Sequence, residues 1–172
     1  VALEGFVESA DEHGPGEWLV LADSQGLAPR LKSVLEVKNQ SVTYLEYSET
    51  ALELLASTLA IMGDSCKGII YMWGLNNPDI TLEPVDDIMA ACHHTSITPL
   101  SVFQAVNNVS WKHSQRLVVV SQNAHAGFDT AHSLPRADQT ALWGFTRVLA
   151  SEHPEYKVSL RSEEHTSELQ SR

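Results

Sequence analysis

The residues after the first predicted strand have the spacing of a phosphate-binding loop but lack most of its glycines. The chain has Leu21-Ala22-x-x-x-Gly26-x-Ala28. A dinucleotide-binding loop of the form T-G-x-x-x-G-x-G places glycines here, so that backbone N–H groups can approach a pyrophosphate at a helix N-terminus. Each alanine adds a Cβ where a phosphate needs bare backbone, and Pro29 removes one N–H from the first helical turn. The spacing therefore predicts a nucleotide-binding fold that has lost its cofactor site.

An acidic residue lies at the distance from Gly26 at which such a fold holds a ribose hydroxyl. Glu46 ends the second predicted strand, 20 residues after Gly26. Two interpretations are open: a surviving nucleotide or S-adenosylmethionine site, or a surface carboxylate at the end of a strand. Because two of the three glycines are missing, we favour the surface carboxylate and predict no cofactor-binding residue.

The side chains that would reduce a ketone on such a fold are also missing. That chemistry needs a Tyr acid, a Lys four residues later that lowers the pKa of the Tyr, and a Ser. Residues 83–110 contain no Lys or Arg, and the positions four residues after the tyrosines hold Ser48, Ala51, Leu75 and Leu160. Ser121 ends a predicted strand where a catalytic Ser would lie, but without partners we interpret it as a polar strand end. We predict no catalytic residue.

The cluster Cys92-His93-His94 has metal-ligating residue types in the wrong arrangement. Adjacent residues on a helix point about 100° apart and cannot chelate one ion together. Structural zinc sites pair their ligands at C-x₂₋₄-C or H-x₃₋₅-H spacing, which this chain lacks. It also has no G-x-S-x-G nucleophile elbow. We predict no metal site and no nucleophilic triad.

Composition excludes several classes of partner. The chain has 172 residues, of which 43% are hydrophobic, enough for one folded domain with a core. Its formal net charge is −11, with 11 scattered basic residues, which argues against nucleic acid. No run reaches the roughly 18 apolar residues of a membrane span, and no signal peptide is visible. Cys66 and Cys92 have no disulfide pattern, so we predict a cytoplasmic protein.

The two ends of the chain differ from its middle. Residues 1–15 are acidic and predict a linker or edge segment. Residues 161–172 resemble the translation of a common sequencing-library adapter, and we exclude them from the fold as an artefact. The chain also begins without Met. We therefore expect an internal fragment whose natural sequence continues past Leu160.

Strand and helix patterns alternate between these ends. The predicted strands are Glu17–Ala22, Ser41–Tyr47, Lys67–Gly74, Arg116–Ser121 and Tyr156–Leu160. The predicted helices are Leu27–Val37, one that starts at a capping box of Thr50 and Glu53, one that Pro99 kinks or breaks, and Asp138–Glu152. A polar loop is predicted at Asn123–Pro135. Each predicted helix has an apolar stripe. The first two stripes contain Leu27, Leu31, Val34 and Leu35, and then Leu52, Leu55, Leu59 and Met62. The last two contain Val85, Ile88, Met89, Cys92, Leu100, Phe103 and Val106, and then Leu142, Phe145, Val148 and Leu149.

Continuous apolar strands that alternate with helices indicate a parallel sheet covered on both faces. Right-handed crossovers then give a doubly wound, Rossmann-like α/β fold, here truncated to about five strands.

Four segments together carry a family resemblance. They are Trp18–Leu31 (WLVLADSQGLAPRL), Lys67–Asn76 (KGIIYMWGLN), Arg116–Gln122 (RLVVVSQ) and Gln139–Glu155 (QTALWGFTRVLASEHPE). In this order they resemble the N-terminal half of the ketoreductase region of modular type I polyketide synthases, over roughly residues 16–160. The loop after Ala22 and the Asn123–Pro135 segment depart from that pattern.

The resemblance implies a division of labour. In that family the first half is a truncated, structural subdomain, and the second half binds NADPH and carries the Ser, Tyr and Lys that reduce a β-ketoacyl chain on an acyl carrier protein. This chain resembles the first half. Its segment Asp138–Leu142 is similar to the one that bears the catalytic Tyr, with Leu142 in the place of that Tyr. The resemblance therefore implies a subdomain that catalyses nothing and binds no cofactor.

We expect residues 16–160 to be this structural subdomain, with the catalytic half of the same chain and the neighbouring synthase domains as its partners. Three alternatives remain, and one of them is a pure interaction module, which predicts a large exposed apolar patch. Another is an autonomous Rossmann-type domain that binds a nucleotide or S-adenosylmethionine through Gly26 and Glu46. The third is the equivalent half of a fatty acid synthase.

Overall fold

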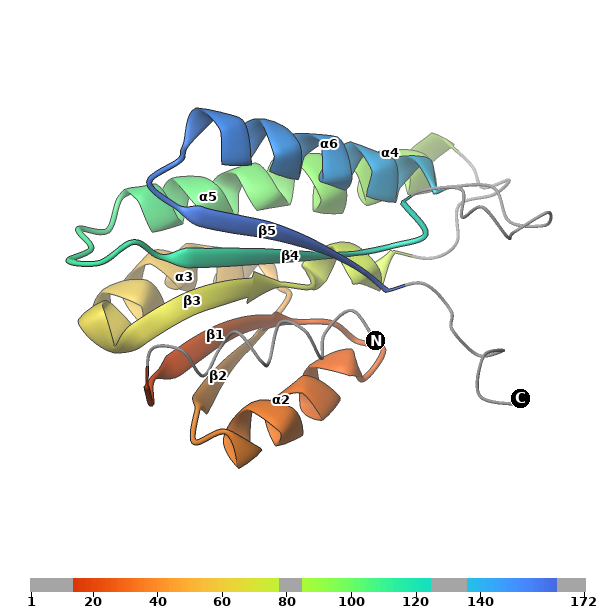
Figure 1. Ribbon diagram of the computed structural model, residues 1–172. Helices are drawn as coiled ribbons and strands as arrows, with labels where there is room; N and C mark the ends of the chain where they lie inside the picture. The colour runs from red at the N-terminus through yellow and green to blue at the C-terminus, as the bar shows by residue number, and fades with distance from the viewer. Residues whose placement is uncertain (1–13, 78–84, 125–135, 164–172) are drawn as a thin grey trace, which may run out of the picture.

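The computed structural model describes residues 14–77, 85–124 and 136–163. Its centre is a parallel sheet of five strands in the order β2-β1-β3-β4-β5. The chain crosses from β1 to one edge at β2, returns to β3 and proceeds to the other edge at β5 (Figure 1). The strands are β1 (Glu17–Ala22), β2 (Ser41–Glu46), β3 (Cys66–Tyr71), β4 (Arg116–Gln122) and β5 (Lys157–Glu163).

Helices cover both faces of the sheet, as Figure 1 shows, with α2 on one side and α5 and α6 on the other. The helices are α2 (Leu27–Val37), α3 (Glu49–Met62), α4 (Val85–Cys92), the π-helical segment η4 (His93–Ile97), α5 (Thr98–Asn107) and α6 (Ala137–Glu152). Two short 3-10 turns, η2 (Gly63–Ser65) and η3 (Trp73–Asn76), flank β3. The predicted doubly wound Rossmann-like α/β fold of about five strands is confirmed.

The core lies in two layers, one on each face of the sheet. The larger layer packs α3, α5 and α6 against alternate residues of the strands, with Leu19, Ile69 and Leu117 among its buried members. The smaller layer packs α2 against the residues between them, including Val20 and Ile70. Since neighbouring strand residues point to opposite faces, a strand buried on both sides is apolar throughout. This explains the continuous apolar runs in the sequence.

Several residues of the predicted helical stripes are exposed instead of buried. These are Val34, Ile88, Met89, Leu100 and Val148. In α2 the buried positions are Ala28, Leu31 and Leu35. In α6 the polar Gln139 and Thr146 are buried while Val148 is exposed. The predictions were wrong at these positions because apolarity alone does not show which side of a helix meets the sheet.

The start of α3 also differs from the prediction. The N-cap is Ser48, whose hydroxyl oxygen accepts the N–H of Ala51 at 2.9 Å. The predicted capping box of Thr50 and Glu53 was therefore wrong, because an acceptor two residues earlier serves the first turn. At the predicted kink or break at Pro99, the helix changes type and the helical backbone continues. The chain passes through η4, and α5 begins with Pro99 in its first turn, where a missing N–H costs no helical hydrogen bond.

The last strand is longer than predicted. β5 runs to Glu163 and pairs in register with β4 through Arg161, Ser162 and Glu163. Residues 161–163, which the sequence analysis left out of the fold, are thus part of β5, since strand pairing uses backbone groups that every residue except proline supplies in full. Most of the predicted linker 1–15, most of the Asn123–Pro135 loop and the remainder of the 161–172 tail lie outside the described residues.

Candidate functional site

In a doubly wound sheet the ligand site lies at the carboxyl ends of the strands, where the strand order reverses. In this chain that point is the gap between the ends of β1 and β3. The loop from β1 to α2 occupies it, and Gly26 is the N-cap of α2 with φ of 91°. This left-handed conformation favours glycine, which explains why Gly26 is retained.

The anion position of this loop is occupied by the side chain of Asp23. One carboxylate oxygen of Asp23 accepts the N–H groups of Gln25 at 2.9 Å and Leu27 at 3.0 Å. The other accepts the N–H of Ala28 at 2.7 Å. These donors are the ones that a pyrophosphate would need at a helix N-terminus. The helix therefore carries its own bound anion.

Two further hydrogen-bond donors of this loop also have acceptors within the protein. The N–H of Ser24 donates to Oδ1 of Asn76 at 2.6 Å. The side-chain amide of Gln25 donates to the carbonyl oxygen of Leu75 at 2.7 Å. Pro29 has no N–H to offer. The loop is thus tied to η3 across the gap where a ligand would enter.

The two alanines predicted to obstruct the phosphate lie in the core. Ala22 and Ala28 are buried in the layer beneath α2. The group that fills the anion position is Asp23, which the sequence analysis did not single out. A signal for it existed, because Asp is a strong capping residue and stands four residues before the first residue of α2.

Gly26 and Glu46 lie at the same edge of the sheet. Glu46 is the last residue of β2 and pairs with Ala22 at the end of β1. Its side chain is exposed. The structure thus places Glu46 where a ribose contact would lie, beside a loop whose donors bind Asp23.

A second polar cluster fills the edge between β3 and α6. The guanidinium of Arg136 forms a 2.9 Å ion pair with Asp138; the Asp138 side chain is buried and that of Arg136 is largely covered. The amides of Asn77 and Gln139 also donate to Asp138, at 3.2 and 3.1 Å. Gln139 further donates to the carbonyl of Gly74 and accepts the N–H of Gln122. We call Asn77, Arg136, Asp138 and Gln139 the buried polar cluster.

The hydrogen bonds of this cluster keep Asp138 charged. Burial alone would raise the pKa of its carboxyl, but the hydrogen bonds from Arg136, Gln139 and Asn77, with the charge of Arg136, outweigh burial and lower the pKa. The cluster links the end of β3 with the end of β4 and the first turn of α6. Its groups bind one another, in a region where a reductase would position substrate.

The positions that would carry reductase chemistry are buried. Ser121 is fully buried, and its hydroxyl lies 3.4 Å from the carbonyl oxygen of Arg161. Leu142 is also fully buried and packs against Gly74, where an added Cβ would come within 2.9 Å of Leu142 Cδ2. Neither side chain presents a group to solvent. This edge of the sheet has no described proton donor in the position of the reductase tyrosine.

Three of the four tyrosine hydroxyls have structural acceptors. They donate to the carbonyls of Ala28 and His94 and to the side chain of Asn107, from Tyr44, Tyr71 and Tyr156 respectively. Burial raises the pKa of each. A raised pKa is the opposite of what an active-site Tyr needs near neutral pH.

The π-helical segment contains His93 and His94. The ring of His94 packs edge-on against Tyr47, with 4.3 Å between centroids. Burial, followed by the charge of His93, lowers the pKa of His94. Within residues 14–77, 85–124 and 136–163, no three His, Cys, Asp or Glu side chains are grouped so as to hold a metal ion.

These features define a Rossmann-type domain related in fold to short-chain dehydrogenases, with both polar regions of its ligand edge engaged internally. The family can be stated more closely. Residues 46–170 match the model of the Rossmann fold domain of the polyketide synthase extender module SpnB, and the chain belongs to that family. It is a fragment of a polyketide synthase ketoreductase region, as the sequence resemblance predicted.

Solved structures agree on the fold. A C2-type ketoreductase from a modular polyketide synthase superposes with a TM-score of 0.65 and 21% identity, over 90% of this chain and 34% of that protein. A short-chain dehydrogenase from Burkholderia cenocepacia J2315 in complex with NADP superposes with a TM-score of 0.57 and 14% identity, over 92% of this chain and 67% of that protein. A bulky-bulky ketone specific alcohol dehydrogenase from Comamonas testosteroni superposes with a TM-score of 0.61 and 11% identity, over 94% of this chain and 67% of that protein. This chain thus spans about a third of the modular ketoreductase.

No curated protein sequence matches the chain. Among the described helices, none has the length and apolarity needed to span a bilayer.

Proposed function

We propose that this chain is the structural, non-catalytic half of a polyketide synthase ketoreductase region. In this proposal residues 16–160 support a separate catalytic half of the same chain. That half would bind NADPH and reduce a β-ketoacyl thioester on an acyl carrier protein. The chain itself would bind no nucleotide and catalyse no reaction. The two free cysteines, Cys66 and Cys92, support a reducing, cytoplasmic setting.

The observation that carries the proposal is the carboxylate of Asp23 at the N-terminus of α2. Its oxygens accept three backbone N–H groups that a pyrophosphate would require. A pyrophosphate placed there would lose those donors and meet a negative charge at close range. Two unit charges about 4 Å apart repel by about 4 kcal/mol at a dielectric constant typical of protein surfaces. The residues of this loop therefore do not fit NADPH.

The buried polar cluster supports the same conclusion for catalysis. Asp138 and Gln139 follow the first residue of α6, and Leu142 lies one turn further along. Gln139 bonds to Gly74 of η3 and Gln122 of β4, and Asp138 bonds to Asn77, so both side chains stabilise the edge that a substrate would enter. Leu142 has no proton to donate. Among the described residues, the reductase positions hold the buried Ser121 and Leu142, without a Tyr and Lys beside them.

An exposed apolar face supports a docking role. Five of the nine large apolar side chains exposed on the described residues lie on α4, η4, α5 and α6, which are neighbours on one side of the sheet. They are Ile88, Met89, Ile97, Leu100 and Val148. An apolar face of this kind is typical of an interface. We propose that it contacts the catalytic half.

Calorimetric titration of the chain with NADPH tests the absence of a cofactor site. We expect no saturable binding up to about 1 mM, because a Kd of 1 mM already corresponds to only about 4 kcal/mol. A matched titration of the Asp23→Gly variant with pyrophosphate tests the cause. Removal of the carboxylate frees three N–H donors, so weak pyrophosphate binding should appear in the variant alone. Micromolar NADPH binding by the unchanged chain would refute the proposal.

The alternative function, a nucleotide or S-adenosylmethionine site, rests on the common edge of Gly26 and Glu46. It predicts a measurable affinity for one of these ligands that Glu46→Ala abolishes. The equivalent half of a fatty acid synthase predicts the same inert loop and differs only in the parent enzyme. Titration with S-adenosylmethionine and NADPH, with Glu46→Ala as the paired variant, separates the first alternative from our proposal.

Docking can be tested by co-expression with the catalytic half of a ketoreductase region. Met89→Asp places a charge on the exposed apolar face and should weaken the complex by at least about tenfold, since burying an unpaired charge is costly. Ile61→Asp is the matched control, because Ile61 is also exposed but lies on α3. Analytical ultracentrifugation measures both. Equal weakening by the two variants would argue against this interface.

A further inference from the structure

A π-helical segment, η4, interrupts the helix that runs from α4 to α5. It spans His93–Ile97, and the N–H of Thr98 donates to the carbonyl oxygen of His93, five residues earlier. Such segments are rare in proteins, and they occur frequently at functional sites. The proposed function gives the two histidines of η4 no role.

Aromatic contacts join η4 to the carboxyl ends of β2 and β3. The ring of His94 packs edge-on against Tyr47, the residue after β2, with 4.3 Å between centroids. Tyr47 in turn packs edge-on against Trp73 at 5.3 Å, and Trp73 is fully buried. The hydroxyl of Tyr71, the last residue of β3, donates to the carbonyl oxygen of His94. His94 therefore contacts the carboxyl edge with both its ring and its backbone.

One nitrogen of the His94 ring is buried without a partner. Its Nδ1 atom has no hydrogen-bond partner in the part of the chain that the structure describes. A neutral histidine carries a hydrogen on only one ring nitrogen. Because a buried N–H without an acceptor is costly, that hydrogen lies on Nε2 in the neutral ring. A second proton would have to bind Nδ1, where it would form a charged, buried N–H with no acceptor.

No negative charge on the described residues offsets a proton on this ring. Neither η3, nor α5, nor Ile88–Cys92 of α4 contains a charged residue. On α6, Asp138 is bound within the buried polar cluster, and Glu46 at the end of β2 is exposed to solvent. The titratable groups that contact His94 are His93 and two tyrosines, and none of these residue types is an anion near neutral pH.

We propose that His94 is a pH-sensitive switch that holds η4 at the carboxyl edge of the sheet. The neutral ring packs against Tyr47 with Nδ1 buried. When Nδ1 takes up a proton from solvent, the charged ring leaves this contact, because water supplies the acceptor that the protein lacks. The side-chain contact between η4 and the segment after β2 is then lost.

The switch lies within the exposed apolar face. Four of the five residues of that face belong to the elements that η4 joins or to η4 itself, and they are Ile88, Met89, Ile97 and Leu100. The contact of His94 with Tyr47 therefore holds the segment that presents most of this face. A link between the switch and docking rests on the proposed function, whereas the switch itself does not.

The direction of the pH effect follows from the surroundings of the ring. Burial, followed by the positive charge of His93, lowers the pKa of His94 below its ordinary value of 6.5. The unfolded chain therefore binds the proton more strongly than the folded chain. The stability that the neutral ring contributes is lost as the pH falls below about 6.5. Asp138 responds only below about pH 4, so the two effects are separated in pH.

Urea unfolding at pH 7.5 and pH 5.5 measures this effect. One histidine with an unfolded-state pKa of about 6.5 changes the unfolding equilibrium constant by at most about tenfold over this range. We expect the pH dependence of the unchanged chain to exceed that of His94→Phe by about threefold or more. Phenylalanine keeps an aromatic ring against Tyr47 and takes up no proton. His113→Gln removes an exposed histidine and is the matched control, which should keep the full pH dependence.

Hydrogen exchange followed by mass spectrometry locates the change. Between pH 7.5 and pH 5.5, the protection of the amides of residues 93–98, corrected for the intrinsic exchange rate, should fall by at least about threefold in the unchanged chain. In His94→Phe the protection should stay constant. Titration of the His94 ring by nuclear magnetic resonance should give a midpoint below 6.5.

Three results would each overturn the inference. They are equal pH dependence of unfolding in the unchanged chain and His94→Phe, unchanged protection of η4 in acid, and a His94 ring that titrates above pH 6.5. If His94→Phe does not fold, His94→Gln takes its place in the same comparison. None of these measurements uses a partner, so the switch can hold or fail independently of the proposed function.

Discussion

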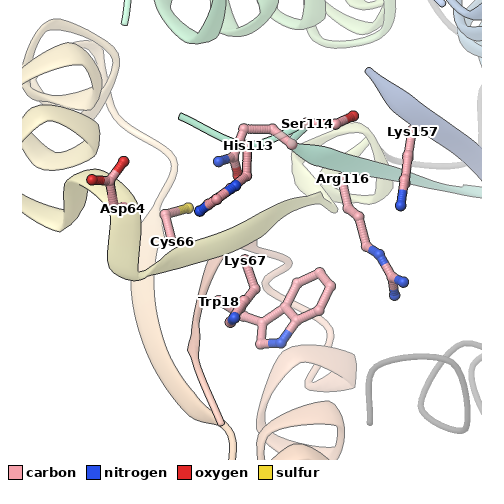
Figure 2. A pocket seen from close by; sticks show the side chains of 9 residues that line it. Trp18, Asp64, Cys66, Lys67, His113, Ser114, Arg116 and Lys157 are labelled. Carbon is pink, nitrogen blue, oxygen red and sulfur yellow. The ribbon is translucent and has the colours of Figure 1, made fainter. Parts of the chain in front are cut away.

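The two ends of the same sheet use their polar groups differently. At the carboxyl end, Asp23 is bound by the N-terminus of α2, and Asp138 is bound by Arg136, Asn77 and Gln139. At the amino end, Lys67, Arg116, Lys157 and Gln115 are among the residues that line a cavity of about 260 Å³ (Figure 2). The carboxyl end, where this fold normally binds its ligand, is internally satisfied.

This difference illustrates our proposal that the fold keeps its architecture without a cofactor site. The five parallel strands and their helices still meet at the carboxyl edge, so the donors of that edge remain in place and must be satisfied. Side chains of the chain itself now satisfy them. The location of a site in related folds is therefore a guide to geometry, and the residues decide whether a ligand can enter.

The largest effect should come from breaking the buried polar cluster. Asp138→Ala leaves the largely covered guanidinium of Arg136 without its carboxylate partner, and loss of one member of a buried pair typically costs about 3–5 kcal/mol. Urea unfolding monitored by circular dichroism measures the change. Asp64→Ala removes the exposed pair with Lys112 and should cost less than about 1 kcal/mol. Similar costs for both variants would contradict the contrast between the two ends.

A smaller loss should follow removal of the anion at α2. Asp23→Ala leaves the N–H groups of Gln25, Leu27 and Ala28 without their acceptor, which should reduce the free energy of unfolding by about 1–2 kcal/mol. Ser24→Ala is the control, since Ser24 is exposed and contributes only its backbone N–H to Asn76. Differential scanning calorimetry detects the difference. An unchanged melting temperature in Asp23→Ala would mean that water replaces the carboxylate without loss.

Acid should weaken the buried polar cluster in a defined direction. The pKa of Asp138 is lower in the folded protein than its ordinary value of 3.8. Its charged form therefore contributes stability above about pH 4, and that contribution disappears as the pH falls through the folded-state pKa. Unfolding free energies from pH 6 to pH 2 should fall less steeply in Asp138→Asn than in the unchanged chain. If the unfolding free energies of both proteins fell with the same pH dependence, Asp138 would not contribute to the loss of stability in acid.

The smallest effect, with no change in stability, should appear in thiol labelling. Burial raises the pKa of the Cys66 thiol to about 11, whereas Cys92 is exposed on α4. At pH 8 about a thousandth of Cys66 is thiolate, so iodoacetamide should modify Cys92 at least about tenfold faster. Cys92→Ser should leave a single slow thiol by mass spectrometry. Fast labelling of Cys66 would show that the amino-end cavity opens in solution.

Much of the fold could be predicted from the order of apolar runs. β1 and α2 have the predicted bounds, and β2, β4 and α6 differ from prediction by one residue at one end. Each run is long, continuous and bounded by turn residues. The stripes were less predictable, because Val34 and Val148 are apolar yet exposed, while Thr146 is polar and buried. The side of each helix that packs against the sheet decides whether those side chains are buried.

The candidate site was predictable only in part. The missing glycines and the absent Tyr-Lys pair indicated a disabled nucleotide loop, but nothing local showed that Asp23 would fill it. Gln115, Arg116 and Lys157 attracted no attention in the sequence, because 47 residues lie between Gly68 and its partner Arg116 on β4. Strand register brings them together.

By itself the sequence determined the class of fold and the order of the elements, because periodicity and residue type act locally, and it predicted that a reductase Tyr–Lys pair is missing. Only the tertiary structure decided which groups satisfy one another. It set Asp23 against the helix N-terminus, enclosed Asp138 among three donors, and aligned two cations beside Gly68. Those contacts join residues from different elements, and their energy depends on distance and burial, which no local pattern specifies.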